Sequence, residues 1–293
     1  MNDVVAIVVT YNRKGILHQC LDKLQNQTIP LDIIVVDNAS TDGTEELFKT
    51  HATNIFYYNT GSNLGGAGGF NFGVRKGVEA GYRYLWLMDD DCFPEQEALD
   101  ELIIAAKQLN DDFGFLSSLA YWTDGELCNM NVQRKTLTKK ISKEDQNYSE
   151  IIIATFVSLF IKAETVRKVG LPIKDFFIWS DDLEYTRRIS KKNKCYLITR
   201  SKVIHAMKSN QKVNISCDSN DRIMRYKLLY RNEMYIYRHE GIGGILYYMG
   251  RIIYHLLKVM ISKSDDKCKK IHIIVSSVKE GIRFNPAIEY IQK

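Results

Sequence analysis

The first part of the chain alternates short apolar runs with segments of helical periodicity. Residues 4–9 form a continuous apolar run that predicts a buried strand, and the next apolar side chains recur on one side of a helix. These side chains are Ile16, Leu17, Cys20, Leu21 and Leu24. A second strand is predicted over residues 32–36, followed by a helical segment at residues 45–50. This βαβα opening predicts an α/β fold with a mostly parallel, Rossmann-like sheet flanked by helices.

A third apolar run ends in three consecutive carboxylates. Residues 84–88 predict a buried strand, and Asp89, Asp90 and Asp91 follow it directly. Side chains at i and i+2 of an extended segment point the same way, so Asp89 and Asp91 can converge on one cation while Asp90 faces elsewhere. Carboxylate oxygens suit Mg²⁺ or Mn²⁺. A solvated acidic turn is the alternative, but open α/β sheets bind ligands at the carboxyl ends of their strands.

Two further polar loops follow the first two predicted strands and should lie at the same edge of the sheet. The first loop contains Thr10 and Asn12, which offer hydrogen-bond donors, although a strand-to-helix turn needs no function. The second begins at Asp37, which could accept a hydrogen bond from a nucleotide ring or ribose. Equally, Asp37 could be a turn residue and Ser40 a helix cap.

The segment that precedes the third apolar run is rich in glycine. Residues 61–69 contain five glycines, and residues 72–77 could continue as a helix. A glycine-rich loop that leads into a helix presents unpaired N–H groups to an anion. The segment does not match the P-loop pattern, and it does not follow the first strand as a Rossmann fingerprint would. A merely flexible loop is the alternative.

Composition indicates a globular protein of a reducing compartment. Hydrophobic residues make up 45% of the 293 residues, which is sufficient for a large core. The six cysteines include no Cys-x-x-Cys pair, so neither a disulfide framework nor a zinc site is indicated. The N-terminal strand has no basic flank, and no apolar run reaches the length of a membrane span. We therefore expect a cytoplasmic protein without signal peptide or spanning helix.

The net charge of +5 is distributed unevenly. Residues 222–293 carry 14 Lys and Arg against 6 Asp and Glu, a net of +8, which leaves 26 against 29 for residues 1–221. Because the basic residues alternate with Tyr, Ile, Leu and Met at helical spacing, we expect a basic amphipathic helical region at 211–293 after the α/β domain at 1–210. Residues 211–221 are expected to form a loop over the active site. The helices would contact a membrane surface, the catalytic domain or another subunit, and nucleic acid is not expected.

Four motifs in order carry a resemblance to a known family. They are Val8-Val9-Thr10-Tyr11-Asn12-Arg13, Val36-Asp37-Asn38-Ala39-Ser40-Thr41-Asp42-Gly43-Thr44, Asn63-Leu64-Gly65-Gly66-Ala67-Gly68-Gly69 and Asp89-Asp90-Asp91. Over about residues 4–210 the chain resembles the inverting glycosyltransferases of family 2 with the GT-A fold. The triple Asp and the glycine motif are similar to those of the galactofuranosyltransferase branch.

The resemblance implies a metal-dependent inverting transfer of galactofuranose from UDP-galactofuranose to a hydroxyl of a glycan acceptor, during assembly of a bacterial surface polysaccharide. The acceptor would be lipid-linked or an oligosaccharide, the enzyme could contact the inner face of the cell membrane, and a homo-oligomer is possible. A rhamnosyltransferase using dTDP-rhamnose is the nearest alternative. From other classes, a noncatalytic nucleotide-binding module remains open, and a nucleotidyltransferase is disfavoured because no glycine-rich phosphate loop lies near residue 10.

The resemblance also implies site residues. The nucleotide and donor would be bound by Thr10, Asn12, Asp37, Asn63, Gly66 and Asp90, and the Mn²⁺ or Mg²⁺ ion by Asp89, Asp91 and His205. Asp181-Asp182-Leu183-Glu184 resembles the base motif of the branch, in which the second Asp is the base, so Asp182 is the predicted catalytic residue.

Two features of the base motif can be weighed from the residues alone. A neighbouring carboxylate raises the pKa of Asp182 and makes it a better base near neutral pH. An acidic helix N-terminus is the alternative reading, and both can hold because Glu184 and Arg188 stand at i, i+4.

Tyr230-Arg231-Asn232 resembles a pattern found in related transferases, but no role is assigned to it.

Overall fold

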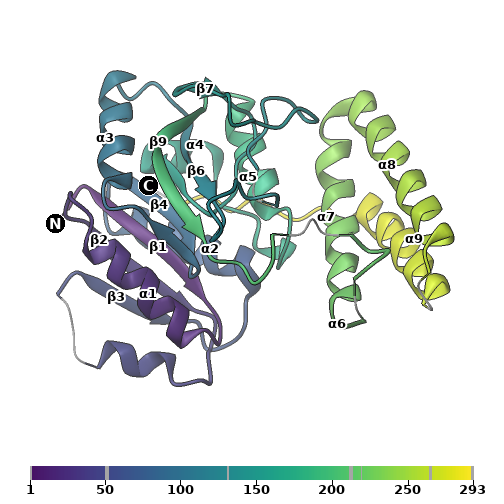
Figure 1. The fold of residues 1–293 in the computed structure, drawn as a ribbon, viewed down its shortest axis with the longest axis horizontal. Helices are drawn as coiled ribbons and strands as arrows, with labels where there is room; N and C mark the ends of the chain where they lie inside the picture. Colours follow the sequence, from purple (N-terminus) through teal and green to yellow (C-terminus); the bar gives the residue numbers. More distant parts are fainter. Residues whose placement is uncertain are drawn as a thin grey trace.

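The computed structural model describes residues 2–49, 53–130, 132–210, 214–218, 220–263 and 266–291. In this part of the chain a nine-stranded sheet has the order β3-β2-β1-β4-β8-β6-β9-β5, and β7 pairs with β9 (Figure 1). The strands are β1 (Val4–Thr10), β2 (Asp32–Asp37), β3 (Ile55–Asn59), β4 (Tyr84–Asp89), β5 (Cys92–Pro94), β6 (Phe115–Tyr121), β7 (Ser149–Glu150), β8 (Leu159–Lys162) and β9 (Tyr196–His205). The helices are α1 (Lys14–Gln25), η1 (Thr44–Phe48), α2 (Gly65–Glu79), α3 (Ala98–Gln108), α4 (Ala163–Val169), η2 (Lys174–Phe176), α5 (Asp181–Ser190), α6 (Asn220–Ile223), α7 (Arg225–Arg238), α8 (Gly241–Ile261) and α9 (Lys267–Arg283).

The α/β fold is confirmed, and the direction of the strands divides the sheet in two. Strands β3, β2, β1 and β4 are parallel, as the βαβα pattern predicts. Beyond β4 the sheet is mixed, because β8 is antiparallel to both β4 and β6, and β9 is parallel to β6 but antiparallel to β5 and β7. Apolar runs indicate where strands lie but not which way they point, so the sequence did not distinguish these two halves.

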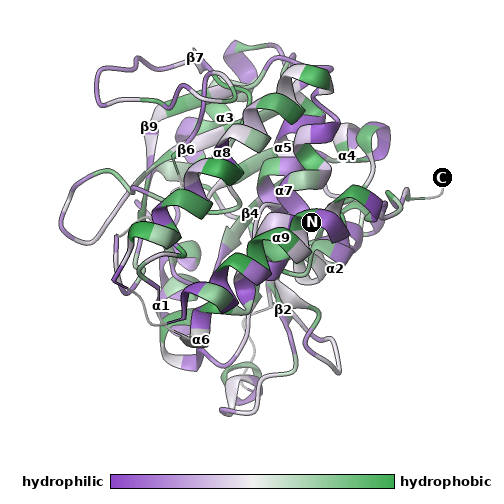
Figure 2. Ribbon diagram, turned by 90° about the vertical axis from the view of Figure 1, so that its right-hand side faces the viewer, coloured by the Kyte–Doolittle hydropathy of each residue, from purple (hydrophilic) through white to green (hydrophobic). Residues whose placement is uncertain are grey.

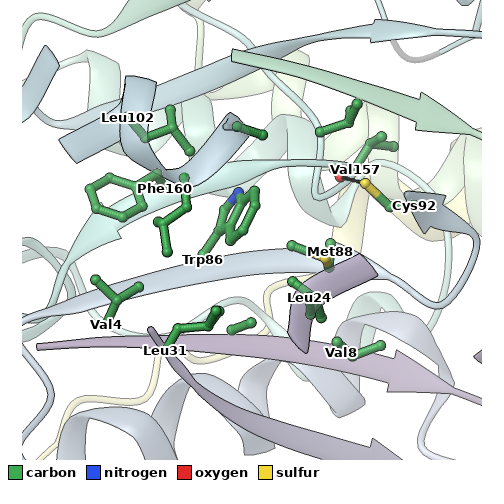
Figure 3. Packing of buried hydrophobic residues seen from close by; sticks show 14 of the residues in the cluster. Val4, Val8, Leu24, Leu31, Trp86, Met88, Cys92, Leu102, Val157 and Phe160 are labelled. Atoms are coloured by element: carbon green, nitrogen blue, oxygen red, sulfur yellow. Dashed lines mark hydrogen bonds between the residues drawn. The ribbon is translucent and has the colours of Figure 1, made fainter. Parts of the chain in front are cut away.

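Each buried strand of the parallel half contributes side chains to two cores. Alternate residues of β1 and β4 face opposite sides of the sheet, so a continuous apolar run is divided between a core under α1 and α3 and a core under α2. Figure 3 shows the first core, where Trp86 lies between Phe160 and Met88. The indole Nε1 of Trp86 donates a hydrogen bond of 2.8 Å to Ser158 Oγ, so its one polar atom is satisfied.

The glycine-rich segment is mostly helical, which corrects the expected loop. Helix α2 begins at Gly65, and its glycines let it lie directly on the sheet. A Cβ at Gly69 would come within 2.5 Å of Val9 Cγ1, and one at Gly73 within 2.5 Å of Ile7 Cγ2. These glycines therefore serve close helix–sheet packing, and only the first residues of α2 are available to a ligand.

Two other local expectations differ from the structure. The segment expected as a helix at 45–50 is the 3₁₀ helix η1 (Thr44–Phe48), and residue 50 lies outside the described residues. Strand β3 (Ile55–Asn59) was not predicted. Its residues are only partly buried at the edge of the sheet, so the segment lacks the strongly apolar run that marked β1 and β4.

The C-terminal helices form a layer beside the sheet (Figure 1). Helices α7, α8 and α9 share a core in which four fully buried tyrosines lie, Tyr226, Tyr230, Tyr237 and Tyr248. Helix α8 begins at Gly241, and both α8 and α9 lie within the region that was expected to be helical. Residues 211–213 and 219 of the expected loop lie outside the described residues. None of the described helices combines the length and the apolar character that crossing a membrane requires.

The segment after α9 returns to the sheet side of the molecule (Figure 1). Leu171 N donates to Glu289 O at 2.8 Å, and the Glu289 carboxylate accepts from Arg75 at 2.8 Å and Lys174 at 2.6 Å. The last described residues thus connect the helical layer to α2 and η2. A division into two domains at residue 210 stays a prediction.

Candidate active site

A cleft of about 700 Å³ lies where the carboxyl ends of β1 and β4 meet the beginnings of α2, α5 and α7. Most of the predicted site residues line it, namely Thr10, Asn63, Gly66, Asp89, Asp90, Asp91, Asp182 and His205. The sheet edge supplies the acidic triplet and His205, and the segment from Phe177 to Asp182 faces them. The cleft therefore has two walls that come from distant parts of the sequence.

The first wall gathers Asp89, Asp91 and His205. Strand β4 ends at Asp89, and three residues later Cys92 pairs with His205 in the β5–β9 ladder, which brings the end of β9 beside the acids. Nε2 of His205 lies 3.0 Å from Asp91 Oδ1. One ligand atom from each of the three side chains lies within 4.8 Å of the others, and two carboxylates with one imidazole fit Mn²⁺ or Mg²⁺.

Arg13 completes this wall, although the sequence analysis gave it no role. Its Nη1 lies 2.6 Å from Asp90 Oδ1 and 2.9 Å from Asp91 Oδ2, and Thr10 Oγ1 donates to Asp90 at 2.7 Å. Asp90 is thus turned towards Thr10 and Arg13, away from the three-residue group. The position of Arg13, three residues after Thr10 in a motif that was already singled out, was the available signal.

The charges of the first wall are concentrated and only partly balanced. Burial, and next the charge of Asp91, raise the pKa of Asp89 to about 7. Burial would also raise the pKa of Asp91, but hydrogen bonds from His205 and Arg13 lower it to about 2. Burial disfavours protonated His205, yet its hydrogen bond to Asp91 raises its pKa to about 10. Such a group of acids is what a divalent cation would stabilise in the charged form.

The second wall carries Asp182 near the start of α5. The backbone N–H of Leu183 donates to Asp182 Oδ1 at 2.7 Å, and burial raises the pKa of this partly buried carboxyl to about 6. Burial, and next the charge of Asp182, keep the pKa of Asp181 well above its usual value. Glu184 is occupied by Arg188, which donates from two nitrogens at 2.8 Å each. Of the acids in this turn, Asp181 and Asp182 are the two that line the cleft.

The aromatic run Phe176-Phe177-Ile178-Trp179 before the acids predicts a strand, but the structure shows a series of strained turns there. Phe177 has φ 63° and ψ −60°, and Ile178 N donates to Phe176 O at 2.7 Å, which closes a γ-turn of the rare, strained form. Trp179 and Ser180 follow with φ 67° each. Three of the four residues from Phe177 to Ser180 therefore have positive φ although none is glycine, and such conformations are costly and cluster at functional sites. Periodicity of side chains does not report φ, so the sequence could not show them.

Two of the predicted nucleotide-binding residues lie outside the cleft lining. Asp37 is buried beside the end of β1, where its oxygens accept from Ser40 N at 2.8 Å and from Tyr57 OH at 2.7 Å. Asn12 Oδ1 accepts from Thr41 N at 2.7 Å. The side-chain oxygens of both residues thus accept hydrogen bonds from the chain itself, and the role of these residues in nucleotide binding stays a prediction.

The two residues predicted to contact the donor do line the cleft. Asn63 Oδ1 accepts from Gly65 N at 2.8 Å and so fixes the turn into α2. A Cβ at Gly66 would meet no atom within 4 Å, so the first turn of α2 is open on its cleft side. An open helix N-terminus of this kind accommodates an anionic group.

Comparison with known proteins gives the family. The model for glycosyl transferase family 2 matches residues 5–163, which is more than half of the chain. This chain belongs to glycosyl transferase family 2. Galactofuranosyltransferase GlfT1 of Mycolicibacterium smegmatis is 28% identical over 195 residues, which are 64% of this chain and 65% of the relative's own length. The match to this relative therefore covers slightly less than two thirds of that protein.

Solved structures confirm the GT-A fold. The crystal structure of GalNAc-T7 with UDP, GalNAc and Mn²⁺ has a TM-score of 0.64 at 12% identity and covers 96% of this chain and 56% of that one. Mannosyltransferase PcManGT from Pyrobaculum calidifontis, in complex with GDP-Man and Mn²⁺, has a TM-score of 0.57 at 16% identity and covers 97% of this chain and 76% of that one. At these identities the likeness concerns the fold alone.

Proposed function

We propose that this family 2 glycosyltransferase moves galactofuranose from UDP-galactofuranose to a hydroxyl of a glycan acceptor with inversion at the anomeric carbon, in bacterial surface polysaccharide biosynthesis. The observation that carries the proposal is the arrangement of the cleft. A carboxylate–imidazole group on one wall faces a carboxylate of raised pKa on the other, and the first turn of α2 lies open beside them. The donor sugar is suggested by the curated galactofuranosyltransferases and by the triple Asp motif.

The residues divide the reaction between the two walls. Asp182 accepts the proton of the acceptor hydroxyl, while the oxygen of that hydroxyl attacks the anomeric carbon from the face opposite the leaving group. The bond between that carbon and the β-phosphate oxygen breaks, and the electron pair leaves with UDP. Asp89, Asp91 and His205 would hold a divalent cation, which would neutralise the charge that develops on the diphosphate. Arg13 keeps Asp90 and Asp91 in place, and Asn63 and Gly66 contact the donor.

Ligand-dependent stability tests donor and metal together. A ligand that binds only the folded state raises the free energy of unfolding by about 2.7 kcal/mol at 100 times its dissociation constant. We expect UDP and UDP-galactofuranose with Mn²⁺ to raise the Tm, and chelation to abolish the shift. A shift with dTDP-rhamnose instead would favour a rhamnosyltransferase. Absence of UDP release in the presence of Mn²⁺, UDP-galactofuranose and glycan acceptors would leave a noncatalytic binding module.

We further propose that the exposed face of α8 contacts an anionic lipid surface, where a lipid-linked acceptor would be reached. Ile242 and Leu246 are 79% and 67% exposed, and the apolar face continues at Met249, Ile253, Leu257 and Met260. Figure 2, which looks onto the C-terminal helices, shows much of α8 coloured as hydrophobic. Lys263 and Lys267 follow the end of the helix, in a region of net charge +8. An apolar face with adjacent lysines is typical of helices that lie in the membrane interface.

Vesicle sedimentation tests this contact. We expect the protein to sediment with vesicles of phosphatidylcholine and phosphatidylglycerol, and less with phosphatidylcholine alone. Ile253→Glu combined with Leu257→Glu should release it, whereas Phe56→Glu, an exposed apolar position on β3, should not. A protein that stays in the supernatant and forms a dimer dispersed by the α8 variant would show that this face joins two copies instead.

A further inference from the structure

Asn232, a buried asparagine of α7, binds the strained segment that leads to Asp182. The Asn232 side chain is 0% exposed, and its Nδ2 lies 3.0 Å from Phe176 O and 2.9 Å from Trp179 O. Ile178 O is a third acceptor at 3.3 Å. One amide nitrogen therefore contacts carbonyl groups on both sides of Phe177, the central residue of the γ-turn.

Arg231 fixes the orientation of this amide. Its Nε and Nη2 donate to Asn232 Oδ1 at 3.1 and 2.9 Å, and Nη2 also donates to Asp175 O at 2.7 Å. Because a guanidinium has donors only, Asn232 must present its oxygen to Arg231 and its N–H₂ to the carbonyl groups. Arg231 is itself held, since its guanidinium lies 4.0 Å from the centre of the Phe284 ring.

The segment needs this support because its backbone is strained. Positive φ in non-glycine residues persists only where the surroundings over-determine it. Ala67 N donates to Phe177 O at 3.1 Å, so together with Asn232 every carbonyl from Phe176 to Trp179 is bonded. The helix that carries Asp182 starts only two residues after Trp179.

We propose that Asn232, oriented by Arg231, is a positioning residue that holds the 176–180 segment and thereby sets the place of Asp182 in the cleft. The inference rests on the proposed function, in which Asp182 is the base. Asn232 does not line the cleft, so it acts through the backbone that it binds and not through contact with either substrate. It gives the Arg231-Asn232 pair of α7 a function in the transfer itself.

Asn232→Asp tests the inference because it removes both N–H donors at nearly constant volume. A small displacement of a catalytic group costs on the order of 100-fold in rate, so we expect kcat to fall about 100-fold. The donor KM and the affinity for UDP with Mn²⁺ should stay within about threefold, since the first wall is untouched. Arg231→Lys, which keeps the charge but loses the fork, should lower kcat about tenfold, and it carries the test if Asn232→Asp does not fold.

Glu233→Gln is the matched control. It removes the ion pair of 3.1 Å to Arg251 between α7 and α8 but leaves every contact of the 176–180 segment. We expect a lower Tm with kcat within about twofold of wild type. If this variant lowers kcat as much as Asn232→Asp, or if Asn232→Asp raises the donor KM and spares kcat, the positioning role is wrong.

A double-mutant cycle separates this inference from the proposed function. If Asn232 acts through Asp182, Asn232→Asp should change the residual rate of Asp182→Asn by less than about twofold, whereas fully multiplicative losses would contradict the coupling. Wild-type kcat in Asp182→Asn would overturn the base assignment itself. A large loss in Asp182→Asn with wild-type kcat in both Asn232→Asp and Arg231→Lys would overturn only the positioning role.

Discussion

The two walls of the cleft are held by different kinds of structure. The wall with Asp91 and His205 is formed at the ends of β4 and β9, where the pairing of β5 with β9 places His205 beside the acids. The wall with Asp182 follows a segment outside any ladder, whose carbonyl groups are bonded by Asn232 of α7 and by Ala67 of α2. The position of the first wall is therefore set by strand pairing, whereas that of the second depends on contacts between elements far apart in the chain.

The largest effect is expected at the second wall. Asp182→Asn should lower kcat about 10³-fold, because general base catalysis contributes on the order of 10²–10⁴-fold and the amide cannot accept the proton. The affinity for UDP with Mn²⁺, measured by calorimetry, should not change, and the Tm should be no lower because burial already disfavours the carboxylate. Transfer at more than a tenth of the wild-type rate would mean that another group is the base.

The first wall should respond in binding. Asp91→Asn removes a predicted metal ligand together with the charge that holds Arg13 and His205. We expect the Mn²⁺ affinity to fall about 100-fold or more, since even outer-shell partners of a metal are worth 10–100-fold. Titration followed by electron paramagnetic resonance measures it. Asp22→Asn, at an exposed acid of α1, is the control. Equal Mn²⁺ affinity in both variants would place the metal elsewhere.

This difference between the walls explains how much of the site could be predicted from the sequence. A buried apolar run ending in Asp89 predicts both a strand and the edge at which its acids lie, because strand geometry is periodic and local. The strained turns at Phe177, Trp179 and Ser180 leave no periodic signal, so the aromatic run at residues 176–179 predicts a strand that the structure does not contain. Their conformation is selected by Asn232, more than 50 residues away, so no window of local sequence contains the cause.

The glycine segment shows the same limit within one motif. Five glycines in residues 61–69 predict a backbone that a ligand can approach, and the open side of Gly66 is consistent with this expectation. However, Gly69 and Gly73 are required because the helix lies against Val9 and Ile7. Composition alone does not distinguish a glycine that faces a ligand from one that faces a strand.

The walls meet at Gly65, and a single methyl group tests the contact. Gly65 has φ +71°, and a Cβ there would lie 2.1 Å from Phe177 O, which is backbone and cannot rotate away. We expect Gly65→Ala to lower the free energy of unfolding by about 2 kcal/mol, from left-handed strain and overpacking. Gly66→Ala, with no atom within 4 Å of its Cβ, should lower it by less than about 0.5 kcal/mol. Similar urea midpoints for the two variants would contradict the contact.

The smallest expected effect concerns the protonation of Asp182. Burial raises its pKa to about 6, so the carboxyl is protonated, and unable to act as a base, at lower pH. At saturating Mn²⁺ the log of kcat/KM should therefore rise with slope near 1 up to about pH 6 and level off above it, a tenfold change per pH unit. Saturating metal keeps Asp89 and Asp91 from contributing to the profile. In Arg231→Lys the plateau should be lower, but the inflection should stay near pH 6 because burial of Asp182 is retained. A flat profile between pH 5 and 7 would show that proton transfer to Asp182 does not limit the reaction, and the distinction drawn between the two walls would then concern structure only.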